Sequence, residues 1–83
     1  MDDDPLQYSR HARDRLMKYH LEEDDVRAVV LWPSRRVVTA DAVEHDGWAS
    51  DGREIKVVTD RSKRLVITVV DFERRRRDRR HAR

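Results

Sequence analysis

The hydrophobic pattern of this chain changes its period near Pro33, and this change limits the fold more than any other feature of the sequence. Before Pro33, apolar residues recur every three or four positions, as they do along one face of a helix. After it, the chain is rich in branched side chains, which favour strands. Helices and strands that are segregated along a chain predict an α+β fold with two N-terminal helices packed on a twisted antiparallel sheet.

The first predicted helix spans residues 10–19. Ser9 precedes it and is a good N-cap, because its hydroxyl can accept a hydrogen bond from a free backbone N–H of the first turn. The expected buried face consists of Ala12, Leu16 and Tyr19, and is widened by Met17.

The second predicted helix lies within residues 21–31, and Pro33 ends it because a residue before proline avoids the α region. Four acidic residues, 22–25, stand in or before its first turn, where the helix dipole favours negative charge. Its expected buried residues are Val26, Val29 and Val30.

Residues 36–43 are rich in branched residues, and the pattern then predicts strands around residues 47–50, over 53–59 and over 64–72. Asp51-Gly52 indicates a two-residue type I′ hairpin turn. The last strand is the longest and most apolar, so we expect it at the centre of the sheet. With a short edge strand at residues 6–8, the predicted order is (β)ααβββ.

Composition excludes several classes of protein. The 83 residues allow one domain, and the absence of cysteine excludes disulfides, thiolate zinc sites and thiol nucleophiles. No apolar run approaches the ~20 residues that span a bilayer, and the N-terminus lacks the pattern of a signal peptide. We therefore expect a cytoplasmic protein that binds no membrane, metal or cofactor.

Charge is divided unevenly along the chain. Seven arginines and two acids give residues 73–83 a net charge of +5, whereas residues 1–72 carry −3. We expect an acidic extension at residues 1–5, a domain at 6–72 and an arginine-rich tail at 73–83. Such a tail attracts phosphate polyanions with little sequence preference. The alternatives are a solvated extension or a helix that packs against an acidic partner. The predicted nucleic-acid-binding residues are Lys56, Arg64, Arg74, Arg75, Arg76, Arg77, Arg79 and Arg80.

A stripe along the first helix places His11, Arg15 and Lys18 at i, i+4 and i+7. A histidine exchanges protons near neutral pH, and a guanidinium holds phosphate through two hydrogen bonds. Together they suit phosphodiester cleavage. The structural alternative is a histidine bonded to backbone and an arginine paired with an acid. Tyr8 and His20 are further titratable groups nearby.

Short motifs in residues 8–16, 21–26, 51–58 and 66–70 resemble those of a small bacterial family, domain of unknown function 4258. The resemblance covers residues 6–72 and excludes the tail. It implies a fold similar to the RelE, ParE and BrnT toxins, some of which cut RNA without a metal ion. By motif position, it implies that His11, Arg15 and Arg53 are the catalytic candidates.

Two functions therefore follow as expectations. The first is a toxin-like RNA-binding protein, a metal-independent ribonuclease of a toxin–antitoxin system. The alternative is a non-enzymatic protein–protein interaction module, whose partner is an antitoxin, another protein or a second copy of the chain. Sequence-specific DNA binding is disfavoured, because the acidic start of the second helix would be repelled by phosphate.

Overall fold

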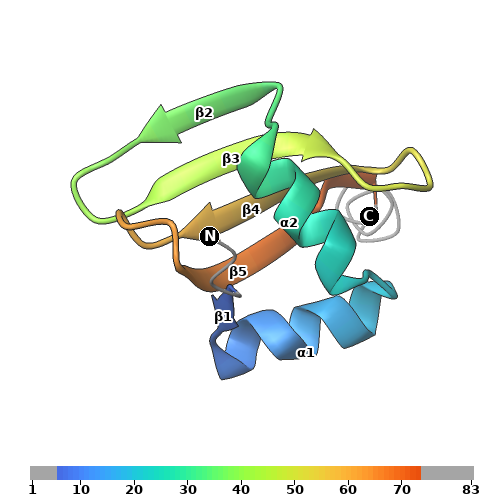
Figure 1. Cartoon of the computed structure of the whole chain (residues 1–83). Coiled ribbons are helices and arrows are strands. Elements are labelled where there is room, and N and C mark those ends of the chain that lie inside the picture. Colours follow the sequence, from blue (N-terminus) through green and yellow to red (C-terminus); the bar gives the residue numbers. More distant parts are fainter. Residues whose placement is uncertain (1–5, 74–83) are drawn as a thin grey trace, which may run out of the picture.

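The structure, a computed structural model, describes residues 6–73, which form an α+β fold with two helices and a five-stranded mixed sheet (Figure 1). The elements are β1 (Gln7–Tyr8), α1 (Arg10–Tyr19), α2 (Glu23–Leu31), β2 (Arg35–Val38), β3 (Val43–Trp48), β4 (Glu54–Thr59) and β5 (Leu65–Asp71). Within the described residues, no helix has the length and apolarity needed to cross a membrane.

The sheet has the order β1-β5-β4-β3-β2, so its last four strands form an antiparallel meander. The short β1 pairs with β5 in parallel, which makes the sheet mixed rather than purely antiparallel. The prediction of three strands after the helices is wrong by one, because β2 is an additional strand. The middle strand is β4, whereas β5 lies between β4 and the two-residue β1.

The additional strand, β2, arises because residues 36–43 contain a turn that has no glycine or proline. The backbone N–H of Thr39 donates to the carbonyl of Ala42, at 2.9 Å. The Thr39 hydroxyl donates to the same carbonyl and accepts from the Ala42 N–H, both at 3.1 Å. A side-chain hydroxyl therefore closes a tight reversal between β2 and β3.

The hairpin at Asp51-Gly52 is present, but its turn is not type I′. That turn needs positive φ at both central residues, and here only Gly52 has it, at 92°. Ala49 N–H donates to the Arg53 carbonyl, and Gly52 N–H donates to the Ala49 carbonyl. This is the pattern of a three-residue loop with glycine in the left-handed region.

Helix α1 begins and ends where the sequence predicts. Ser9 Oγ accepts from the Ala12 N–H at 3.0 Å and donates to the Ile67 carbonyl of β5 at 2.7 Å, so the cap also fixes the helix to the sheet. The predicted face is buried, except that Met17 is 77% exposed and does not widen it. Helix α1 packs on β5 and β1.

Helix α2 lies across β3 and β4 (Figure 1). It approaches β3 closely at Gly47, where an added Cβ would lie 3.1 Å from Val29. Asp25, in its first turn, is buried and accepts hydrogen bonds from the backbone N–H of Ser50, at 2.8 Å, and of Glu22. Burial favours a higher pKa for Asp25, but these hydrogen bonds outweigh it and lower the pKa.

Thirteen apolar residues form the buried core between the helices and the sheet. They are Ala12, Leu16, Tyr19, Leu21, Val26, Val29, Val30, Val43, Ala49, Ile55, Val57, Val66 and Val69. The strand residues among them lie on the sheet face that the helices cover.

A chain of hydrogen bonds runs through the buried His45 of β3. Arg36 donates from Nη2 to the Val30 carbonyl at 2.8 Å and from Nε to His45 Nδ1 at 3.2 Å. His45 Nε2 must then donate to Thr59 Oγ1, at 3.0 Å, and Thr59 donates to the Asp60 carbonyl. Burial, followed by the charge of Arg36, lowers the pKa of His45 to about 4.

Acid should therefore destabilise the fold through His45. Histidine in an unfolded chain has a pKa near 6.5, so between pH 6.5 and 4 the unfolded chain binds the additional proton. The free energy of unfolding, measured with urea, should fall by about 2 kcal/mol between pH 7 and pH 5. His45→Gln should remove most of this pH dependence. Lys18→Gln, a change at an exposed position of α1, should retain it. An unchanged pH dependence in His45→Gln would contradict this account.

Candidate functional site

Helix α1 brings His11, Arg15 and Tyr19 into one ladder of hydrogen bonds. Arg15 Nε donates to His11 Nε2 at 3.3 Å, and Arg15 Nη1 donates to the Tyr19 hydroxyl at 2.6 Å. The Arg15 guanidinium also lies 5.8 Å from the centre of the Tyr19 ring. Spacings of four residues place the three side chains on the same side of the helix.

The exposure of these three side chains increases from Tyr19 to His11. Tyr19 is buried, Arg15 is half-buried and His11 is exposed. Tyr19 therefore fixes Arg15, while His11 and the outer part of the guanidinium face the solvent. Two of the three predicted catalytic residues, His11 and Arg15, are thus in direct contact, and we call them the His11–Arg15 pair.

Arg53, the third predicted catalytic residue, bonds to the protein instead. Its Nη1 donates to the Tyr19 carbonyl at 2.6 Å and to Asp71 Oδ2 at 3.0 Å, and its Nη2 donates to the His20 carbonyl at 3.3 Å. Its Nε donates to Asp51 Oδ2 at 2.7 Å. We call this set of contacts the Arg53 clamp. It caps the carboxyl end of α1, where the helix dipole favours a cation.

The other predicted cations lie away from the His11–Arg15 pair. Lys56 is on the sheet face opposite the helices. Its Nζ bonds to Glu44 Oε1 at 2.9 Å and lies 5.8 Å from the centre of the Phe72 ring. Arg64 is exposed just before β5. Six predicted contacts in the tail, Arg74, Arg75, Arg76, Arg77, Arg79 and Arg80, lie outside the described residues.

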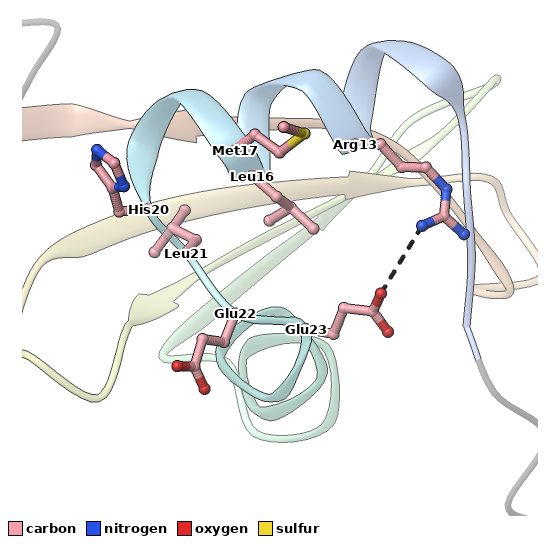
Figure 2. Close-up of a pocket in the computed structure, with 7 residues that line it drawn as sticks. All are labelled: Arg13, Leu16, Met17, His20, Leu21, Glu22 and Glu23. Atoms are coloured by element: carbon pink, nitrogen blue, oxygen red, sulfur yellow. Dashed lines mark ion pairs between the residues drawn. The ribbon is translucent and has the colours of Figure 1, made fainter.

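An open hollow of about 700 Å³ lies between α1 and the start of α2 (Figure 2). Arg13 and Glu23 face each other across it, with Arg13 Nη1 3.9 Å from Glu23 Oε2. Both side chains are exposed, so this ion pair adds little stability. The lining residues are Arg13, Leu16, Met17, His20, Leu21, Glu22 and Glu23.

The hollow and the His11–Arg15 pair occupy different sides of α1. At about 100° per residue, Arg13 and Met17 lie about 120° to 160° around the helix from His11 and Arg15. The hollow therefore does not enclose the predicted catalytic residues, which stand on an open helix surface.

The two nearby titratable groups, Tyr8 and His20, have structural roles. Burial, followed by the charge of Glu23, raises the pKa of Tyr8 to about 12, so its phenol keeps its proton at neutral pH. Arg13 lies 5.4 Å from the centre of the Tyr8 ring. His20 ends α1 in the left-handed region, with φ of 56°. Among residues 6–73, no group of three or more His, Cys, Asp or Glu side chains is placed to hold a metal ion.

Sequence reasoning missed one member of the ladder. The sequence predicts Tyr19 as a core residue, and its ring is buried, but its hydroxyl also orients Arg15. The available signal was the spacing of four residues between Arg15 and Tyr19 on a predicted helix.

The Arg53 clamp should contribute to stability rather than to ligand binding. Arg53→Lys keeps the charge, but one ammonium cannot reproduce a fork that reaches four acceptors, and Asp71 is buried. We expect a loss of roughly 2 kcal/mol in the free energy of unfolding, measured with urea. The matched control, Arg61→Lys at an exposed turn position, should change it by less than about 0.5 kcal/mol. Equal stability of the Arg53→Lys and wild-type chains would contradict the clamp.

Comparisons with known proteins give no match: no protein-family model, no curated protein and no solved structure matches the chain. The resemblance to domain of unknown function 4258 therefore stays a prediction that depends on the short motifs alone. What the structure establishes is an α+β fold whose helix α1 carries the His11–Arg15 pair.

Proposed function

We propose that this protein is a toxin-like RNA-binding protein and that the His11–Arg15 pair cleaves RNA without a metal ion. The observation that supports this most is the 3.3 Å hydrogen bond between a guanidinium and an exposed imidazole. The two groups are the ones that cleavage of a phosphodiester by its own 2′-hydroxyl requires, namely a base and a cation for the phosphate.

Binding begins at Arg15. Its bond to the Tyr19 hydroxyl and the contact with the Tyr19 ring hold the guanidinium in place before RNA arrives. Such fixation reduces the entropy that binding costs. An RNA phosphate accepts from the Nε and Nη donors of Arg15 as a bidentate partner.

When a phosphate replaces His11 as the partner of Arg15 Nε, His11 becomes free to act as the base. In the structure, His11 Nε2 accepts from Arg15 Nε. When the phosphate takes that donor, Nε2 is free to accept the proton of the 2′-hydroxyl. The 2′-oxygen then attacks phosphorus, the bond to the 5′-oxygen breaks, and the leaving oxygen takes a proton from water. The products are a 2′,3′-cyclic phosphate and a 5′-hydroxyl.

The positive charge around the His11–Arg15 pair favours RNA binding. Helix α1 carries four cations, Arg10, Arg13, Arg15 and Lys18, and a single acid, Asp14. The tail adds seven arginines over residues 73–83. Because the tail lies outside the family resemblance, its proposed role is to capture RNA through phosphate contacts, with the chemistry on α1.

Cleavage of a short single-stranded RNA at low salt, with EDTA present, tests this function. The wild-type chain should release a 2′,3′-cyclic phosphate, and His11→Ala should reduce the rate at least 100-fold. His11 is exposed, so the variant should keep the fold. His20→Asn is the matched control, since asparagine tolerates the left-handed conformation of that exposed position.

Two results would contradict the proposal. One is a wild-type chain that binds RNA and leaves it intact. This result would agree with the proposed RNA binding and contradict the proposed ribonuclease activity. The other is a His11→Ala chain that cleaves as fast as wild type with unchanged circular dichroism, which would show that His11 is not the base.

A further inference from the structure

Exposed apolar side chains gather at the β2 edge of the sheet. Of the seven large apolar side chains that are exposed in the described part of the chain, four lie within residues 31–38. Leu31 and Trp32 end α2, and Val37 and Val38 end β2. Val37 and Val38 point to opposite faces of the sheet, so both faces of this edge carry an exposed apolar side chain, whose burial would stabilise an association.

The backbone of β2 offers hydrogen bonds on its outer side. The Thr39 N–H donates to the Ala42 carbonyl, so the backbone N–H of residue 39, just past the end of β2, faces the β3 side. Hydrogen-bonded and non-bonded pairs alternate in an antiparallel ladder, so Val37 also bonds inward, to Glu44. The N–H and C=O groups of Arg36 and Val38 therefore face away from β3, and β2 is the last strand of the sheet on that side.

Charged side chains often protect an edge strand from pairing, but Arg36 is held away from the edge. Its guanidinium bonds to the Val30 carbonyl of α2 and to buried His45. It therefore lies over the helix-covered face, and Arg35, exposed at the start of β2, is the other charged side chain of this strand.

We propose that β2 pairs antiparallel with β2 of a second copy of this chain, about a two-fold axis that passes between the two Val37 residues. In this register Arg36 and Val38 of one copy exchange backbone hydrogen bonds with Val38 and Arg36 of the other. Val37 faces Val37 as a non-bonded pair, the kind whose side chains approach most closely. The two sheets become one continuous sheet.

Charge complementarity favours a second copy in this register. Each Arg36 is opposite a valine, and each Arg35 is opposite Thr39, so no arginine faces another arginine. Thr39 begins the turn that carries exposed Asp41, which brings Arg35 of the second copy toward an acid. The interface is the same patch on both copies, as a two-fold dimer requires. This inference goes beyond the proposed ribonuclease activity, and its test alters no residue of α1.

Analytical ultracentrifugation of the full chain over a range of concentrations tests the pairing. The wild type should dimerise. Val37→Lys and Val37→Glu should each weaken dimerisation at least 10-fold, because like charges would meet directly at the axis. An equimolar mixture of the two variants should restore the dimer as a heterodimer. Val37→Thr, branched and uncharged, is the matched control and should stay close to wild type.

The mixture is decisive because the heterodimer forms only if residue 37 of one copy lies opposite residue 37 of the other. Its recovery also shows that both variants are folded. A wild-type chain that is monomeric at every concentration would overturn the inference, and so would a dimer that both single variants leave unchanged. Neither result depends on RNA cleavage, so failure here is distinguishable from failure of the ribonuclease proposal.

Discussion

The hydrogen bonds of Arg53 are the constraint on which the rest of this structure depends. From one position before β4, its guanidinium reaches the last carbonyls of α1, Asp51 in the neighbouring turn and buried Asp71 at the end of β5. At the opposite end of α1, Ser9 bonds both to the first turn and to β5. The helix is therefore fixed to the sheet at both ends, and the side that it presents to solvent is determined.

Three arginines in this small domain have different roles because their partners differ. Arg53 and Arg36 bond to backbone carbonyls and to buried side chains, so the donors that make these bonds are used within the fold. Arg15 bonds to one buried hydroxyl and to one exposed imidazole. Displacement of the imidazole by a phosphate costs little burial or packing. This difference makes Arg15 the better candidate for ligand binding, although all three were similar in the sequence.

Local features of the fold could be predicted from the sequence, and long-range contacts could not. The α1 bounds and the Ser9 cap depend on residues within a few positions of one another. The turn at Thr39 was missed because a hydroxyl closes it without glycine or proline. The bond between Arg53 and the Tyr19 carbonyl spans 34 residues, so a motif position alone could not show that Arg53 bonds within the fold.

The most direct test of this division of roles is an NMR titration with a 2′-O-methyl RNA, which lacks the 2′-hydroxyl and is not cleaved. The Nε–H signals of the arginine side chains report each guanidinium separately. We expect the Arg15 signal and the α1 amide signals around His11 to shift with added RNA, and the Arg53 signal to stay in place. Shifts at Arg53 with an unperturbed Arg15 would contradict the account.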